Sequence, residues 1–388
     1  MKTFLHQKNP QPVRRYLRSC AAVTKLKTTT MKCLPMIMNK HERNRRRGRS
    51  TATKQIAMTD GVLPAIPVID VRYGGTPDIA RVAEDQLRDL FGRARRAFTP
   101  PLLGLADRVS QNWLQRSANP YLSDIDEISA MLRGKGAYAL NTSYEWACTS
   151  GVGDDPEGGV HLLRVLDWRL SGLGRNLVVA TQTGPAGDFV NVTWPGFVGV
   201  LTAMAPGRFA AAINQPPMTS FGMTPPVDWM IGHVRLWHSD GLPPAHLLRQ
   251  VFEVCKTYEA AKQMLAQTPL CLPAFFTLAG ANDGEGCIIE RTQHRAAIRE
   301  MPTAIANHWI ALPKRGRART RTSRHRHRMM QAAVEARAPW QAHPILNQNT
   351  RVVATMNPSR GKLSVQGFER SGPATSCLVV GGQGSHIG

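Results

Sequence analysis

The sequence predicts an α+β fold in which helices and strands occur in separate blocks. Apolar residues recur at three- and four-residue intervals between about residues 76 and 94, a pattern typical of an amphipathic helix. After about residue 148 the pattern changes to short β-type runs bounded by Gly, Pro, Asn or Asp. Because the strands follow one another in runs, layered sheets covered by helices are favoured over alternating βαβ units.

The part of the chain before residue 148 is expected to be mainly helical. A short strand is predicted over 66–71, followed by a helix that Thr76 caps and in which Pro77 takes the first position. A second helix is predicted over about 122–132. The apolar face of the first helix is expected to comprise Ile79, Val82, Ala83, Leu87, Leu90, Phe91 and Ala94. We therefore expect a helical region over 58–147 and the sheets over 148–388.

The part of the chain after residue 148 is expected to contain two groups of strands separated by a long helix. The helix is predicted over 244–267, where apolar residues again recur with helical spacing. The strands are predicted over 161–165, 177–183, 189–194, 198–203, 209–213, 275–279, 287–290, 296–299, 303–306, 350–355 and 362–368.

The net charge of +22 resides in two segments of this 388-residue chain. Residues 1–57 carry 15 Lys or Arg and one acid, and residues 314–328 carry eight basic residues and no acid, so the remainder is neutral. Residues 1–57 lack a sustained apolar period and are expected to be disordered; a transit peptide, or extra sequence before a true start at Met58, are the alternatives. The second run is expected to be a basic surface loop, with RNA or metal binding through its arginines, His325 and His327 left open.

A nucleic-acid-binding protein is the alternative from a different functional class. The body of the chain is neutral, aromatic residues do not interleave with the basic ones, and no recognisable binding motif is present. Nucleic acid is therefore not favoured as a partner.

The cysteines indicate a reducing compartment. The seven cysteines form no CxxC pair and have no metal-like spacing. No stretch reaches the ~20 apolar residues of a membrane span, and no apolar run near the N-terminus is long enough for a secretory signal. The sequence therefore predicts a cytoplasmic protein without a transmembrane segment, a metal or another cofactor.

Cys148 is the candidate nucleophile. It lies in the run Trp146-Ala147-Cys148-Thr149-Ser150, and a guanidinium and a carboxylate follow at Arg164 and Asp167. A nearby cation favours the thiolate, the form in which cysteine attacks a carbonyl. In a regular strand Arg164 and Asp167 point to opposite faces, so spacing alone does not bring both to Cys148. A core thiol and an ordinary ion pair are the alternatives.

A series of motifs around and after Cys148 resembles one known family. They are Tyr144–Ser150, Leu163–Trp168, Gly196–Phe209, Ala212–Gln215, Gly284–Arg291 and Ala306–Trp309. In this order they resemble the acid ceramidase and N-acylethanolamine acid amidase-like amidases, which are related to choloylglycine hydrolases. The resemblance extends from about residue 63 to about residue 370. It implies an N-terminal nucleophile (Ntn) hydrolase with a four-layer αββα sandwich, in which autoproteolysis between Ala147 and Cys148 frees the nucleophile.

The resemblance also implies roles for individual residues. Cys148 is the nucleophile, and Arg164 and Asp167 are its polar supports. Asn214 and Asn307 supply amides for the oxyanion and for orienting the substrate. For these two asparagines, turn positions at strand ends are the alternative.

Three further features of the family comparison are less specific. A later arginine usually completes the site, and Arg324 is our choice within the Arg-rich run. Trp168, Trp194 and Phe197 flank the matched motifs and are candidates for an apolar acyl pocket, with ordinary core positions as the alternative. Gln215 departs from the acidic residue that some members have there, which leaves open whether this chain matures.

These features predict a precursor that cuts itself before Cys148 and then hydrolyses linear amides through a thioester. The freed α-amine of Cys148, with a reference pKa of about 7.7–8.0, would accept the thiol proton. The expected partners are a small-molecule amide, favoured as an N-acylethanolamine- or N-acyl-amino-acid-like compound, and the light and heavy chains of one precursor; the oligomeric state is left open. An acyltransferase of the same fold and an uncut, inactive family member are the alternatives.

Overall fold

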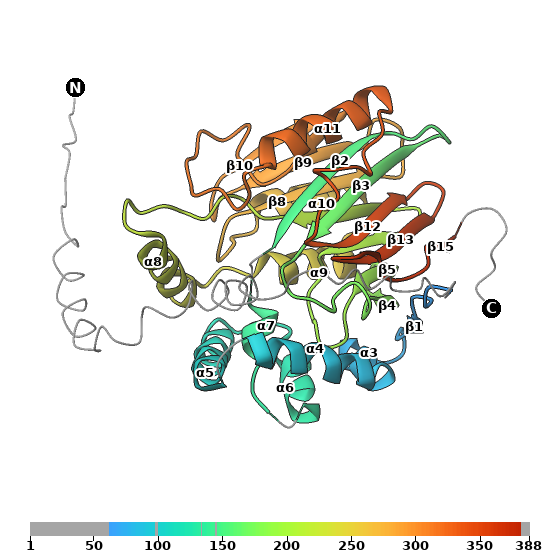
Figure 1. The fold of residues 1–388 in the computed structure, drawn as a ribbon. Helices are drawn as coiled ribbons and strands as arrows, with labels where there is room; N and C mark the ends of the chain where they lie inside the picture. The colour runs from blue at the N-terminus through green and yellow to red at the C-terminus, as the bar shows by residue number, and fades with distance from the viewer. Residues whose placement is uncertain (1–61, 98–99, 133, 144–145, 382–388) are drawn as a thin grey trace, which may run out of the picture. The chain divides into compact units, whose positions relative to one another are not determined.

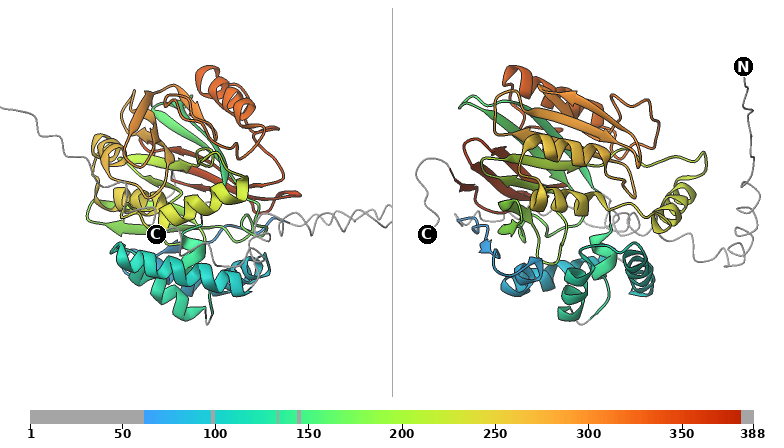
Figure 2. Two further views of the ribbon diagram at one scale, coloured as in Figure 1. Left: turned by 90° about the vertical axis from the view of Figure 1, so that its left-hand side faces the viewer. Right: turned by 180° about the vertical axis from the view of Figure 1, so that it is seen from behind.

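The computed structural model describes residues 62–97, 100–132, 134–143 and 146–381. Within this part, two β-sheets lie face to face and helices cover both outer surfaces (Figures 1 and 2). Helices α9 (Pro244–Val254) and α10 (Tyr258–Gln267) pack on one sheet, and α11 (Ser323–Ala336) packs on the other. The predicted α+β, four-layer αββα sandwich is confirmed. The predicted disordered extension over 1–57 lies outside the described residues.

The larger sheet has eight strands in the order β1-β4-β5-β6-β7-β8-β9-β10. Only the pairing of β1 with β4 is parallel. The strands are β1 (Val68–Asp70), β4 (Val178–Gly184), β5 (Gly187–Thr193), β6 (Thr202–Ala205), β7 (Phe209–Asn214), β8 (Ala274–Gly280), β9 (Gly286–Arg291) and β10 (Ala296–Glu300).

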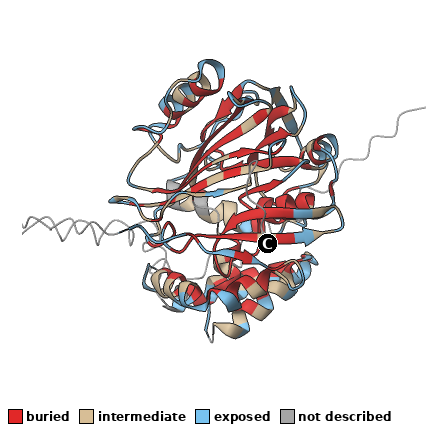
Figure 3. Ribbon diagram, turned by 90° about the vertical axis from the view of Figure 1, so that its right-hand side faces the viewer, coloured by how far each residue is buried: buried red, intermediate tan, exposed pale blue. Residues whose placement is uncertain are grey.

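The smaller sheet has seven strands, and all of its pairings are antiparallel. Its order is β11-β2-β3-β12-β13-β14, with β15 also paired to β13. The strands are β2 (Ala147–Asp154), β3 (Val160–Asp167), β11 (Thr303–Ile305), β12 (Thr350–Asn357), β13 (Lys362–Glu369), β14 (Gly372–Pro373) and β15 (Leu378–Val380). Strands β2 and β3 pack against β7 and β8 of the larger sheet, so both faces of β2 and β3 are covered (Figure 3).

The region before Cys148 forms a helical layer below the sandwich in Figure 1. Its described helices are α3 (Thr76–Val82), α4 (Glu84–Ala97), α5 (Pro100–Arg116), α6 (Leu122–Met131) and α7 (Ala137–Asn141). The same region also supplies β1 to the edge of the larger sheet, where Ile69 packs with Val178 and Ala180. The short strand predicted over 66–71 is therefore present as β1, and the segment before Cys148 contributes a strand to the sandwich.

Several predicted boundaries differ from the structure because local breaks interrupt apolar patterns. The first helix is interrupted at Ala83 (φ −111°, ψ 46°), and Val82 is 68% exposed instead of lying on the apolar face. Gly75, not Thr76, occupies the N-cap position. The long helix over 244–267 is divided at Cys255, which is extended, and the side chain of Thr257 then caps α10.

Other elements were not predicted at all. Helices α5 and α8 (Pro225–Trp237) are absent from the sequence prediction. The strand predicted over 198–203 is shorter than expected, since residues 198–201 are not part of a strand. The basic run over 314–328 is a surface loop only in its first part, because α11 begins at Ser323. This correction matters for the site, since α11 lies directly on β2.

Two glycines of β2 allow α11 to pack this closely. A Cβ atom at Gly153 would lie 2.8 Å from the carbonyl oxygen of Val334, and one at Gly151 would lie 2.8 Å from a methyl group of Val334. Side chains at these positions would force the helix away from the strand. The glycines thus keep the N-terminal turn of α11 within reach of Cys148.

Candidate active site

Cys148 is the second residue of β2. The two faces of β2 and its neighbour β3 carry different polar side chains. Cys148 is opposite Leu166 and Ser150 is opposite Arg164 in the antiparallel pairing with β3. These side chains lie on the face toward the larger sheet, because side chains alternate along a strand. Thr149 and Asp167 lie on the other face, toward α11. Cys148 is fully buried.

On the face between the sheets, Asn214 is the centre of a buried hydrogen-bond network. Its Oδ1 accepts from Ser150 Oγ at 2.9 Å and from Arg164 Nη1 at 2.6 Å. The Ser150 hydroxyl also lies 2.6 Å from Thr277 Oγ1 on β8. The Nδ2 group of Asn214 donates to the carbonyls of Ile305 and Ala306 at 3.3 and 3.2 Å. These bonds orient the amide and place Arg164 beside the Cys148 strand.

On the face toward α11, Asn307 and Arg326 hold the Cys148 backbone at both ends. The Cys148 N–H donates to Asn307 Oδ1 at 3.1 Å, and the Cys148 carbonyl accepts from Arg326 Nη1 at 2.6 Å. Arg326 also donates to Asn307 Oδ1 at 2.7 Å and to the Thr149 hydroxyl at 2.6 Å. Asn307 donates in turn to the carbonyl of Gln215 at 2.8 Å. The peptide bond between Ala147 and Cys148 is therefore fixed at its nitrogen.

Asp167 lies on the same side as Arg326. Its carboxylate accepts from Asn347 Nδ2 and from Thr350 Oγ1, each at 2.9 Å, and lies 3.8 Å from Arg326 Nη1. The pairing of β12 with β3 shifts register between Thr350 and Val352, opposite Asp167. Arg164 and Asp167 thus occupy opposite faces of β3, as the spacing indicated.

The structure corrects the choice of arginine. Arg324 is exposed, whereas Arg326 is buried and reaches Cys148. Periodicity was the missing signal, because the buried stripe of α11 comprises Ser323, Arg326, Met330, Ala333 and Val334. Extended toward the N-terminus from its apolar members, this stripe selects Arg326 over Arg324. Ser150, Thr277, Asn347 and Thr350 were also missed, because hydroxyl and amide residues give no distinctive spacing.

Burial and charge act in opposite directions on the Cys148 thiol. Burial raises the pKa of the Cys148 thiol. The positive charges of Arg164 and Arg326 lower this pKa, and the negative charge of Asp167 raises it further. Burial also raises the pKa of the Asp167 carboxyl, against the influence of Arg326 and of the bonds from Asn347 and Thr350. Within the described part of the chain, Arg164 has no carboxylate within 4 Å. A buried guanidinium without such a partner favours a negative charge nearby, such as a thiolate.

The three predicted pocket aromatics are adjacent to one another. The rings of Trp168 and Trp194 are 6.2 Å apart and perpendicular, and Trp194 lies 6.5 Å from Phe197. Trp194 and Phe197 are buried, and Trp168 is partly buried. Trp146 completes the row, with its ring 5.2 Å from that of Trp168.

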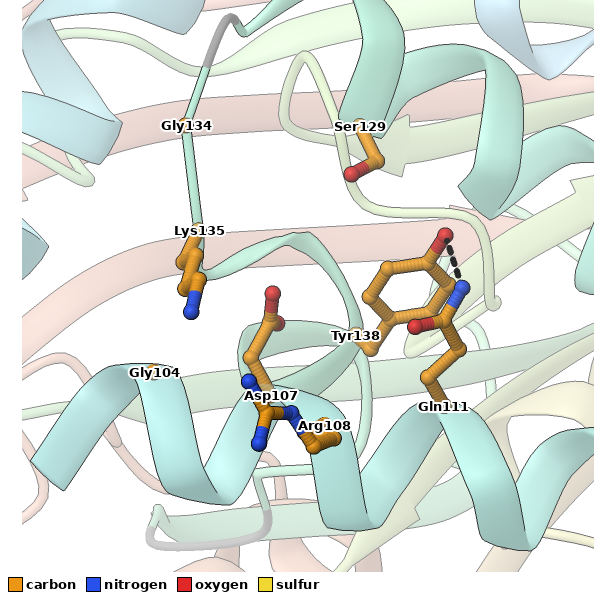
Figure 4. Close-up of a pocket in the computed structure, with 8 residues that line it drawn as sticks. All are labelled: Gly104, Asp107, Arg108, Gln111, Ser129, Gly134, Lys135 and Tyr138. Atoms are coloured by element: carbon orange, nitrogen blue, oxygen red, sulfur yellow. Dashed lines mark hydrogen bonds between the residues drawn. The ribbon is translucent and has the colours of Figure 1, made fainter.

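A pocket of about 290 Å³ occurs elsewhere, among the helices before Cys148 (Figure 4). Its walls combine charged and hydroxyl groups, and Gln111 donates to the Tyr138 hydroxyl at 2.9 Å. None of the predicted site residues lines it. The lining residues are Gly104, Asp107, Arg108, Gln111, Ser129, Gly134, Lys135 and Tyr138.

Gln215 lies beside the site through its backbone. Its carbonyl accepts from Asn307, and its buried side-chain oxygen has no hydrogen-bond partner among the described residues.

The described residues include no cluster of His, Cys, Asp or Glu suited to a metal ion. Among the helices of the described ranges, none combines the length and apolar character needed to cross a bilayer.

Comparisons with known proteins agree with the motifs. Residues 228–354 match the family model described as acyl-coenzyme A:6-aminopenicillanic acid acyl-transferase. Acid ceramidase from Bos taurus is 30% identical over 224 residues, which cover 52% of this chain and 55% of that protein. N-acylethanolamine-hydrolyzing acid amidase from Oryctolagus cuniculus is 30% identical over 158 residues, covering 40% of this chain and 42% of that protein. The chain thus spans about half the length of the relatives it matches.

A solved structure of a Caenorhabditis elegans ortholog of N-acylethanolamine-hydrolyzing acid amidase is also similar. The two sequences are 18% identical, the alignment covers 60% of this chain and 100% of the C. elegans chain, and the TM-score is 0.45. The family-model match lies within the region over which the motifs run in order. These matches agree with the resemblance of the motifs to acid ceramidase and N-acylethanolamine-hydrolyzing acid amidase, to which this chain is similar over about half of its length.

Proposed function

We propose that this chain is the precursor of a cysteine amidase, which cuts itself between Ala147 and Cys148 and then hydrolyses N-acyl amides through a thioester. The observation that carries the proposal is the double hold on Cys148. Asn307 accepts from the nitrogen of the peptide bond to be cut, while Arg326 binds the Cys148 carbonyl. With the backbone fixed at both ends, the thiol is restricted to a few positions relative to the Ala147 carbonyl.

The first reaction is the maturation of the chain. The Cys148 sulfur attacks the Ala147 carbonyl carbon, a C–S bond forms, and the C–N bond breaks as its nitrogen takes up the thiol proton. Water then adds to the carbonyl carbon, the C–S bond breaks, and the sulfur regains a proton. The net change is the addition of one water, which gives a light chain ending at Ala147 and a heavy chain beginning at Cys148.

Amide hydrolysis repeats this chemistry on a substrate. The freed α-amine accepts the thiol proton and returns it to the leaving nitrogen. Asn307, which holds this nitrogen in the uncut chain, would hold the amine in the same place. Arg164 would stabilise the thiolate, and Asp167 would hold Arg326 on the other face.

Asn214 is proposed to donate to the developing oxyanion. Its two bonds to the Ile305 and Ala306 carbonyls are 3.3 and 3.2 Å long, longer than the usual 2.9–3.0 Å. A substrate oxyanion is a stronger acceptor and can compete for one of these N–H groups. A donor of this kind contributes roughly 2.7–4 kcal/mol in comparable sites.

The relatives' names support amide substrates with an acyl group. Acid ceramidase and N-acylethanolamine-hydrolyzing acid amidase are named for such compounds. The aromatic row formed by Trp168, Trp194 and Phe197 supports an apolar acyl group, and fatty-acyl amides are the proposed class. The cytoplasmic location expected from the sequence is part of this proposal.

Turnover of N-acyl amides before and after thiol alkylation tests the proposed chemistry. The cut protein should release amine and fatty acid from N-acylethanolamines, and iodoacetamide should abolish this release. Cys148→Ser and exposed Cys377→Ser are the matched variants, and only the first should lose activity. Turnover that survives complete alkylation would exclude a cysteine nucleophile.

An acyltransferase is the second candidate, because the family model that matches 228–354 is described by that activity. In this case an amine, not water, attacks the thioester. Adding increasing amounts of a primary amine to the assay should leave the fatty acid as the main product of a hydrolase. A new amide as the main product at millimolar amine would identify a transferase.

A further inference from the structure

Trp146 lies directly before Ala147, whose carbonyl is the acyl group in the proposed self-cleavage. In self-cleavage the uncut chain is its own substrate: Ala147 provides the acyl carbonyl, and the residues before it extend in the acyl direction. In the proposed mechanism the sulfur, Asn307 and Arg326, which are held together by these bonds before cleavage, serve the later substrate as well. The groups that precede Ala147 therefore mark the path of the acyl chain.

The side chain of Trp146 is almost completely buried along this path. Its exposed fraction is 1%, and its ring lies 5.2 Å from Trp168 with the planes inclined at 53°. Trp168 then contacts Trp194 edge to face. The indole N–H of Trp194 donates to the carbonyl of Leu173 at 2.7 Å, so this ring presents only its apolar surface.

We infer that Trp146 fills, in the uncut chain, the subsite that accepts the acyl chain of substrates in the cut enzyme. This inference rests on the proposed function and specifies the length of acyl chain that the substrate should have. The first ring carbon of Trp146 is separated from the Ala147 carbonyl carbon by about six covalent bonds. A straight acyl chain reaches the same place at about its seventh carbon. Shorter acyl groups leave the subsite of Trp168 and Trp194 empty.

The subsite gives Trp168 a role in selecting acyl groups by length. Trp168 is the ring in direct contact with Trp146, and it is only partly buried. Its removal takes away the wall on which the distal methylenes pack. It leaves Cys148, Arg164 and Arg326 with their own contacts.

A series of N-acylethanolamines with straight acyl chains of two to fourteen carbons tests the inference on the cut enzyme. We expect kcat/KM to be nearly constant up to about six carbons and then to rise by up to roughly four-fold per methylene. Trp168→Ala should remove the rise, so that the ratio of kcat/KM between the dodecanoyl and butanoyl amides falls toward one, and Trp168→Phe should retain most of that ratio. A rise that begins at two carbons, or one that Trp168→Ala leaves unchanged, would overturn the inference.

Inhibition by the maturation product is an independent readout. N-acetyl-Trp-Ala with a free carboxylate reproduces the end of the light chain, and N-acetyl-Ala-Ala is its matched control. We expect competitive inhibition at least about ten-fold stronger for the Trp peptide, and loss of that difference in Trp168→Ala. Equal inhibition by both peptides would overturn the inference. Failure of the proposed function is distinguishable, because it gives no turnover of any acyl chain length.

Discussion

At the scale of single residues, the site is divided between the two faces of β2 and β3. Arg164, Ser150 and Asn214 lie between the sheets, and Asn307 and Arg326 lie on the side of α11. Cys148 is the point where the two groups meet. Its side chain belongs to one group and its backbone is bound by the other.

Substitution of Arg326 should slow self-cleavage far more than substitution of Arg324. Arg326→Lys cannot reproduce the separate bonds to the Cys148 carbonyl, Thr149 and Asn307, so the cleavage rate should fall by roughly 10²–10³-fold. Arg324→Lys, on the exposed side of the same helix turn, should cleave at the normal rate. The fraction of cut chain against time measures both rates. Equal cleavage rates in the two variants would show that Arg326 has no role in self-cleavage.

The sequence predicted these residues unevenly, for physical reasons. Cys148, Arg164, Asp167, Asn214 and Asn307 lie in motifs that have a family counterpart, and the structure brings them together. Arg326 is different, because its selection depends on the phase of α11 and not on a local motif. Within a run of arginines, only the apolar residues one and two turns later reveal which arginine faces inward.

At the scale of elements, α9 connects the helical layer to the sandwich. His246 of this helix is fully buried, and its ring lies edge-on to Tyr121 at 5.4 Å. Neither ring nitrogen has a hydrogen-bond partner among the described residues. Burial lowers the pKa of His246 to about 3, so the folded protein keeps this ring neutral.

The neutral His246 should make the stability fall with acid. In the unfolded chain histidine titrates near pH 6.5, so below that pH the unfolded state binds a proton that the folded state does not. The contribution is complete above about pH 6.5 and is lost progressively toward pH 3. We expect on the order of 2–4 kcal/mol between these limits. Urea unfolding of His246→Phe should show a smaller loss over this range, whereas exposed His238→Phe should resemble the parent chain.

At the scale of the whole described molecule, the regions before and after Cys148 are held together by extensive non-covalent contacts. Strand β1 joins the larger sheet, and an apolar cluster contains Leu87, Phe91 and Trp113 together with Val198. Arg249 adds an ion pair to Asp124 at 2.7 Å and stacks over the ring of Tyr121. Cutting the chain before Cys148 breaks none of these contacts.

The light and heavy chains should therefore remain associated after cleavage. They should elute together on size exclusion in native buffer and separate only in denaturant. Arg249→Ala removes the buried partner of Asp124 and Glu253, which are themselves partly exposed, at a cost of about 1–3 kcal/mol, and should release the light chain at lower urea. Separation of the parent chains in native buffer would contradict this account.

The strands of the sandwich could be predicted from the sequence more completely than the helices. Strands β7, β8 and β9 were predicted nearly in full, because buried runs between turn residues give a clear signal. Helices α5 and α8 were missed, and a single helix was predicted where α9 and α10 are separate. Their ends depend on packing between layers, which a periodicity over one segment does not contain.

Intact mass spectrometry of the purified chain tests the central claim most directly. The parent chain should give two species whose masses meet between Ala147 and Cys148 and together exceed the precursor by one water. Cys148→Ala should remain a single chain with the same fold by circular dichroism. An uncut parent chain, or cleavage at another bond, would contradict maturation at Cys148.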